Sequence, residues 1–155
     1  MSKRYSLEEL VPVMEETLNE NGEVSFVSAG TSMMPTIRDR KDTVTLVKPN
    51  GKLKKGDVPF YRRDNGQYIL HRIVYVNGDT YVTCGDNQWV NEYNVRQDQV
   101  IGVLKSIERN GKVYSVNDGK YKAYLFFLPA VRWAYRLYNA AKRRVRNFIN
   151  YLFKR

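Results

Sequence analysis

Two side chains of this sequence could together form a nucleophile and its base. Ser32 lies in a loop-like stretch between Gly30 and Pro35, and His71, the only histidine, lies in a run of β-type residues. A serine hydroxyl is a weak nucleophile that needs a nearby base and backbone donors for the developing oxyanion. Imidazole, with an unperturbed pKa of about 6.5, can take that proton at neutral pH. The pair predicts nucleophilic catalysis, although each residue alone also fits an ordinary turn or a structural histidine.

A carboxylate beside the histidine would complete a three-residue arrangement. Asp86 lies in the turn-like Gly85-Asp86-Asn87, and Glu92 follows six residues later. Either carboxylate could orient His71 and stabilise its protonated form, so both are candidates. The only cysteine, Cys84, is interpreted as a buried core thiol, and a single cysteine excludes an intramolecular disulfide. The sequence has no cluster of His and Cys from which a metal site could be predicted, and no phosphate-binding glycine loop that would indicate a cofactor.

Taken together and in this order, these segments resemble the conserved boxes of the signal peptidase I and LexA-like serine peptidases. The resemblance covers about residues 24–104 and rests on Ser32-Met33-Met34-Pro35-Thr36, the Gly-Asp-Val at 56–58, His71-Arg72, and Gly85-Asp86-Asn87 followed by Val100-Ile101-Gly102. It implies that Ser32 is the nucleophile and that His71 stands where bacterial-type members have a lysine. This is similar to the branch found in the endoplasmic reticulum, archaea and some spore-forming bacteria. In that branch the assisting acid lies slightly after Gly-Asp-Asn, where this chain has Glu92.

The same resemblance implies which neighbours support the reaction. Part of the family has a serine donor two residues before the nucleophile, and Gly30 occupies that position here. Backbone N–H groups, chiefly that of Ser32, are therefore expected to hold the oxyanion. The supporting residues expected are Gly30, Thr31, Met33, Pro35 and Arg72. The implied substrate is an extended peptide or precursor protein with small residues before the cut.

The elements that must position these residues are predicted from periodicity and turn signals. Residues 6–21 have helical spacing with Ser6 as N-cap, inside an N-terminal helical segment 1–22. Short β-type runs at 24–27, 43–47, 68–76, 81–84 and 100–104 fill a body at 23–118, with hairpin signals at 77–78 and 110–111. We expect a mainly β fold of coiled or barrel-like antiparallel sheets, as in the signal peptidase and LexA-like fold.

The C-terminal segment 119–155 differs from the rest in charge. The net charge is +10, yet residues 1–118 carry 16 basic and 16 acidic side chains, while residues 119–155 carry ten basic and no acidic ones. From about residue 130 the pattern predicts an amphipathic helix with a cationic face that includes Arg132, Arg136, Arg143 and Arg146. This composition is typical of a helix lying on an anionic membrane, although packing of the apolar face on the β-rich body is the open alternative.

Location and partners follow from these patterns. The N-terminus lacks the features of a targeting segment, and the longest charge-free apolar stretch, residues 123–131, is too short to span a bilayer. We expect a cytoplasmic protein, peripheral at the membrane, with a peptide substrate and no nucleic-acid partner. The alternative is a non-catalytic or regulatory LexA-like module that binds membrane or DNA through its basic helix.

Overall fold

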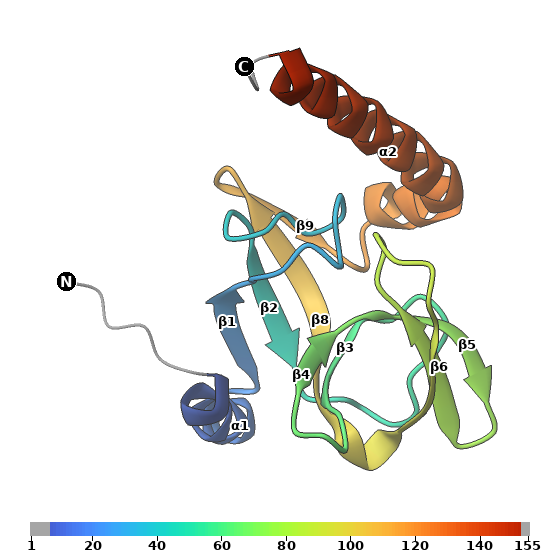
Figure 1. The fold of residues 1–155 in the computed structure, drawn as a ribbon. Helices are drawn as coiled ribbons and strands as arrows, with labels where there is room; N and C mark the ends of the chain where they lie inside the picture. The colour runs from blue at the N-terminus through green and yellow to red at the C-terminus, as the bar shows by residue number, and fades with distance from the viewer. Residues whose placement is uncertain (1–6, 153–155) are drawn as a thin grey trace.

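The computed structural model describes residues 7–152, so the predicted N-cap Ser6 lies outside the described residues. It contains two helices, α1 and α2, and nine strands (Figure 1). In chain order the elements are α1 Leu7–Asn21, β1 Glu23–Val27, β2 Thr43–Val47, β3 Pro59–Arg62, β4 Tyr68–Leu70, β5 Arg72–Asn77, β6 Thr80–Cys84, β7 Glu92–Arg96, the 3-10 turn η1 Gln97–Gln99, β8 Val100–Arg109, β9 Lys112–Ser115 and α2 Gly119–Leu152.

The strands form two antiparallel sheets. The larger sheet has the order β1-β2-β8-β3-β4, with β9 paired to β8, and the smaller has the order β5-β6-β7. Both predicted hairpins are present: Asn77-Gly78 joins β5 to β6, and Asn110 and Gly111, both with positive φ, join β8 to β9.

The expected fold class holds only in part. Among the described residues the sheets stay open and form no barrel, because the end strands β1 and β4 do not pair with each other. The helices, of 15 and 34 residues, hold about as many residues as the strands, so the chain is mixed α/β rather than mainly β.

The run at 68–76, predicted as one strand, is divided at His71. Residues before it form β4 in the larger sheet, and residues after it form β5 in the smaller sheet. The His71 N–H still donates to the carbonyl of Pro59 on β3, at 3.3 Å. His71 therefore lies where the chain crosses between the sheets.

The apolar cores hold the segments that carry the candidate site. Val44, Leu46, Leu104 and other buried side chains of the larger sheet form one core, which also contains Met33 and Ile37 from the loop around Ser32. A second core, which includes Tyr61, Ile73, Tyr81 and Val95, lies between the two sheets.

The C-terminal helix α2 begins at Gly119, the first residue of the expected C-terminal helical segment 119–155 and before the amphipathic pattern that starts at about residue 130, and it contains Pro129. Figure 1 shows it bending after its first turns (orange) and then projecting beyond the sheets (red). Tyr121 and Leu128 in the first part are buried, whereas every side chain from Ala141 to Tyr151 is exposed. Neither described helix is long and apolar enough to cross a membrane.

Candidate active site

The loop around Ser32 is anchored to the core of the larger sheet by apolar side chains. Met33 and Ile37 are buried in the core, and the Ile37 N–H donates to the Met33 carbonyl at 2.9 Å. Ser32, directly before Met33, is only partly covered. Within residues 7–152 its backbone N–H has no hydrogen-bond acceptor. The loop thus leaves both the hydroxyl and the N–H of Ser32 available to a substrate.

A buried carboxylate, Asp42, fixes the far end of this loop. Arg38 and Arg109 both donate to it, and Nη2 of Arg109 also donates to the Thr36 carbonyl at 2.9 Å. Burial alone would raise the pKa of Asp42, but the hydrogen bonds from Arg109 and Arg38 outweigh it and lower the pKa below its ordinary value. The ionised carboxylate therefore ties β8 to the loop that carries Ser32. Sequence reasoning missed this contact, because Arg109 lies 67 residues from Asp42.

The turn at 85–88 packs directly against the Ser32 backbone. The Asn87 N–H donates to the Ser32 carbonyl at 2.7 Å, and Asn87 Nδ2 donates to the Thr31 carbonyl at 3.2 Å. A Cβ atom on Gly85 would lie 2.6 Å from the Ser32 carbonyl oxygen, closer than any side chain can approach. Glycine is required at 85 because the two backbones touch there.

The same turn adjoins His71. Arg72 pairs with Cys84 in the β5–β6 ladder, so His71, one residue earlier, comes at the end of β6 where Gly85 begins the turn. His71 is 4% exposed and lines a cavity of about 640 Å³ whose wall is formed largely by residues 88–92. The Ser32 hydroxyl and the His71 ring form no hydrogen bond with each other within the described residues. Ser32 and His71 therefore both lie beside the 85–88 turn, but they are not hydrogen-bonded to each other.

Burial sets the charge state of His71. It lowers the pKa of the imidazole below the ordinary value of 6.5, although the negative charges of Glu92 and, less strongly, Asp86 oppose the shift. The neutral ring, which can accept a proton, is therefore the form present at neutral pH.

Asp86 is held in a buried network that does not include His71. Both Asp86 oxygens accept from Arg72, at 2.9 and 2.7 Å, and Oδ2 also accepts from the Thr36 hydroxyl. Arg72 additionally donates to the Gly56 carbonyl and the Tyr121 hydroxyl. Burial would lower the pKa of Arg72, but the bonds to Asp86 outweigh it and raise the pKa. This ion pair joins the Ser32 loop, the residue after His71 and α2.

Glu92 is the carboxylate that borders the His71 cavity. It accepts from Arg63 at 2.6 and 2.7 Å and from the Tyr61 hydroxyl at 2.7 Å. Burial would raise its pKa, but the hydrogen bonds from Arg63 and Tyr61 keep it below the ordinary value. Among the described residues neither Glu92 nor Asp86 forms a hydrogen bond with the imidazole. The identity of an orienting acid therefore stays a prediction.

Helix α2 contributes contacts that the sequence did not indicate. A hydroxyl has one proton, and because that of Thr36 points to Asp86, the Tyr124 hydroxyl must donate to Thr36, at 2.8 Å. Tyr135 contacts the Met34 sulfur at 3.5 Å, and Arg132 donates to the Gln88 carbonyl at 2.5 Å. The first part of α2 thus touches both the Ser32 loop and the 85–88 turn.

The remaining predicted site residues differ in their surroundings. Gly30 has φ 113°, a conformation that favours glycine, and its N–H donates to Asp39 at 2.8 Å. Of the four arginines expected on a membrane, Arg132 donates to the Gly85 and Gln88 carbonyls of the 85–88 turn. Arg143 and Arg146 are exposed, and the side chain of Arg136 lies outside the described part of the structure. Within residues 7–152, His, Cys, Asp and Glu nowhere gather in a group of three that could hold a metal ion.

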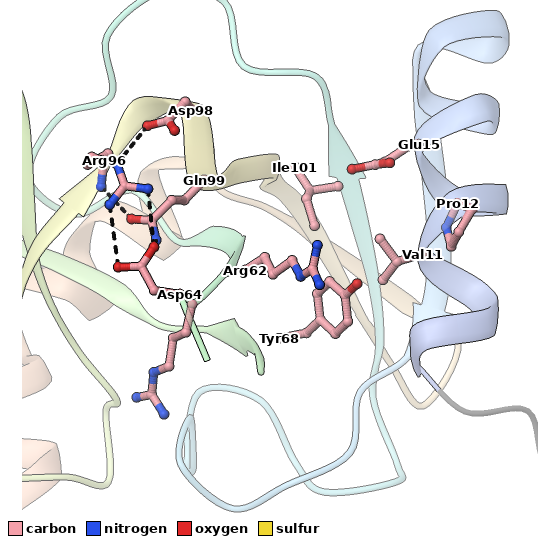
Figure 2. A pocket seen from close by; sticks show the side chains of 11 residues that line it. Val11, Pro12, Glu15, Arg62, Asp64, Tyr68, Arg96, Asp98, Gln99 and Ile101 are labelled. Atoms are coloured by element: carbon pink, nitrogen blue, oxygen red, sulfur yellow. Dashed lines mark hydrogen bonds and ion pairs between the residues drawn. The ribbon is translucent and has the colours of Figure 1, made fainter. Parts of the chain in front are cut away.

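A separate hollow of about 560 Å³ lies between α1 and the β3–β4 edge, away from Ser32 and His71 (Figure 2). Three of its charged residues pair with one another: Arg96 binds Asp64 and Asp98. Arg62 stacks on the Tyr68 ring at 5.9 Å and lies on the side facing α1. No serine, cysteine or histidine lines this hollow, so Ser32 and His71, beside the 85–88 turn, remain the candidate catalytic residues. Comparison of the chain with models of known protein families and with curated proteins gives no match in either case.

Proposed function

We propose that this protein is a serine endopeptidase of the signal-peptidase type, with Ser32 as nucleophile and His71 as general base. The observation that carries the proposal is the turn at 85–88. It contacts the Ser32 backbone through Asn87 and continues into the wall of the cavity that His71 lines. The order of the motifs, which resembles the boxes of this peptidase family, supplies the reaction type.

The proposed reaction has two stages. Oγ of Ser32 attacks the carbonyl carbon of the scissile bond while His71 accepts the hydroxyl proton. The Ser32 N–H, which has no acceptor among the described residues, donates to the resulting oxyanion. The C–N bond then breaks, and His71 gives its proton to the leaving amine. A water molecule repeats the attack on the acyl-enzyme and releases the new carboxylate and the free Ser32 hydroxyl.

Glu92 is the proposed assisting acid, and Asp86 is a positioning residue. Asp86 does not line the His71 cavity, and its oxygens accept from Arg72 and Thr36, which joins the Ser32 loop to the residue after His71. Glu92 faces the His71 cavity and acts more strongly on the His71 pKa than Asp86 does. In this proposal Glu92 stabilises the protonated imidazole by its charge, and it reaches the ring directly once a substrate fills the cavity.

The proposed substrate is a leader or precursor peptide that binds in extended form, in the cytoplasm. The cavity beside His71 is bordered by the exposed apolar residues Trp89 and Val90 as well as by polar side chains, so it can accommodate a mixed peptide segment. Small residues before the cut are proposed from the family resemblance.

Cleavage of a peptide library, read by mass spectrometry, tests the proposal. We expect the wild-type chain to cut, and Ser32→Ala and His71→Ala each to abolish cutting while circular dichroism shows a folded protein. Ser25→Ala, at an exposed position of strand β1, is the matched serine control and should cut normally. A fluorophosphonate probe should label the wild type and not Ser32→Ala. Near-native cleavage by either site variant would overturn the mechanism.

The alternative is a non-catalytic module related to these peptidases. The observation that favours it is the lack of a hydrogen bond between Ser32 and His71 in the described structure. If the wild-type chain neither cuts any library peptide nor reacts with the fluorophosphonate, the catalytic proposal fails and the binding role is left.

A further inference from the structure

We propose that the distal part of α2, residues 137–152, is a membrane-binding surface that lies in the headgroup region of an anionic lipid bilayer. This inference does not depend on the proposed hydrolytic reaction. It rests on three features of the described residues: an uncovered apolar face, cations without internal partners, and a helix that leaves the body.

The apolar face of this part of α2 is exposed. Residues 138, 141, 145, 148, 149 and 152 recur at spacings of three and four, which places them on one side of a helix. Tyr138, Val145 and Phe148 are 62%, 58% and 62% exposed, and no element of the body covers them. A continuous apolar face of this kind in contact with water indicates a binding surface.

The basic side chains of the same segment are unpaired. Lys142, Arg143, Arg144 and Arg146 are exposed and form no ion pair with any described residue, and the sequence has no acidic residue from 119 to its end. An anionic surface complements this charge. A second copy of the helix would bring like charges together, so it is a poor partner.

The combination of the two faces selects lipid among anionic partners. A nucleic acid would bind the cations but would leave the apolar side exposed. A bilayer takes both, because the acyl boundary accepts the apolar face while the headgroups accept the cations. Aromatic residues such as Tyr138, Phe148 and Tyr151 are suited to this boundary.

The first part of α2, which contacts the Ser32 loop and the 85–88 turn, would bring the body to the same membrane surface. Arg132 and Pro129 line a hollow of about 380 Å³ together with the exposed rings of Trp89 and Trp133. Trp89 also borders the His71 cavity. Membrane binding through the distal helix therefore places an aromatic rim, and the cavity beside it, near lipid.

Sedimentation of the full-length chain with vesicles tests the proposal. We expect binding to vesicles that contain phosphatidylglycerol in phosphatidylcholine, weak binding to phosphatidylcholine alone, and a loss of binding at high salt. Arg143→Gln with Arg146→Gln should weaken binding by about fivefold for each charge removed. The matched control, Lys52→Gln with Lys54→Gln on the exposed surface of the body, should bind as the wild type does.

A second variant separates lipid from nucleic acid and from simple electrostatics. Phe148→Ser with Ile149→Ser retains every charge, and it should also lose vesicle binding and the blue shift of tryptophan fluorescence that accompanies insertion of Trp133. Wild-type vesicle binding by this variant, or no binding of the wild type to phosphatidylglycerol, would overturn the proposal. So would tight binding of duplex DNA at physiological salt that this variant retains. Cleavage of a short soluble peptide, measured in parallel, reports on the proposed reaction separately.

Discussion

Charged side chains have opposite surroundings in the β-rich body and in the distal part of α2. In the body, Arg72 and Asp86 are 5% and 1% exposed and bind each other with two hydrogen bonds. In distal α2, Arg143 and Arg146 are exposed and have no internal partner among the described residues. The charges of the body are used to hold segments together, whereas those of the distal helix remain available to another molecule.

The difference has an energetic basis. Burying two ions costs solvation free energy that their attraction offsets only when the geometry is good and the remaining lone pairs are satisfied. Arg72 meets this condition through Asp86, Gly56 and Tyr121. An exposed cation has no such cost, so it contributes little to stability and keeps its full charge for binding.

The largest effect is expected from breaking the buried pair. Asp86→Asn leaves the Arg72 guanidinium buried without a counter-charge, which should lower the free energy of unfolding by about 3–5 kcal/mol. Urea denaturation followed by circular dichroism measures the change.

The exposed pair Lys52–Asp79 provides the control for this comparison. Asp79→Asn should leave the denaturation midpoint unchanged, because both side chains are in water. If Asp86→Asn changed the denaturation midpoint as little as Asp79→Asn, the buried network would not be what joins the Ser32 loop to β5, the strand that follows His71.

A smaller effect is expected where α2 meets this network. Tyr124→Phe removes the hydroxyl that donates to Thr36 and should cost about 0.5–1.5 kcal/mol in unfolding free energy. It should also lower peptide turnover, because Thr36 lies in the Ser32 loop. Tyr138→Phe, on the exposed part of the same helix, should change neither quantity. Equal losses of unfolding free energy or turnover in both variants would contradict the distinction between the first part of α2, which contacts the body, and its distal part.

The titration of His71 tests how the body's charges act on the proposed base. Burial holds the folded-state pKa of His71 below the unfolded value, so its contribution to stability is fully present above about pH 6.5 and is lost as the pH falls through the lowered value. The acidic limb of the activity profile should lie in the same window, below 6.5.

Glu92→Gln should lower the His71 pKa further, because the carboxylate that raises it is removed while Arg63 remains. As His71 is the only histidine, proton NMR of a chain without a histidine tag follows the ring directly. Glu16→Gln on α1 is the control and should leave the titration unchanged. An upward shift in Glu92→Gln would exclude Glu92 as the acid beside the base.

Local patterns predicted much of the fold. The runs at 24–27, 43–47 and 81–84 coincide with most of β1, β2 and β6, because alternating β-type residues bounded by turns carry their own signal. The run at 68–76 did not indicate its division between two sheets, since the residues on either side of His71 have the same β-type character. No β-type run was predicted at β3, β7 or β9, although the hairpin signal at 110–111 implies a strand where β9 lies. The proline at the start of β3 and the exposure of most of β7 and β9 weaken the signal there.

For the candidate site, too, features local in the sequence were predicted and long-range contacts were not. Residue type and motif order indicated Ser32, His71 and the two carboxylates before any contact was known. The partners of those residues could not be predicted, because Thr36 meets Asp86 across 50 residues and Tyr124 across 88. Such contacts depend on how the sheets and α2 pack, which spacing along the chain does not encode.

The smallest effect on stability is expected from removing the distal helix. Truncation after Ala140 deletes a segment whose described side chains, from Ala141 to Tyr151, are all exposed, so the free energy of unfolding should stay within about 0.5 kcal/mol of the full-length value. Cleavage of a short soluble peptide should also be unchanged, while binding to anionic vesicles should be lost. Truncation after Leu128 is the informative counterpart, because it also removes Arg132 and Tyr135, which contact the 85–88 turn and Met34, and it should reduce both stability and turnover. A loss of more than about 1 kcal/mol after the shorter deletion would mean that the distal helix packs on the body, as the alternative interpretation of its apolar face requires.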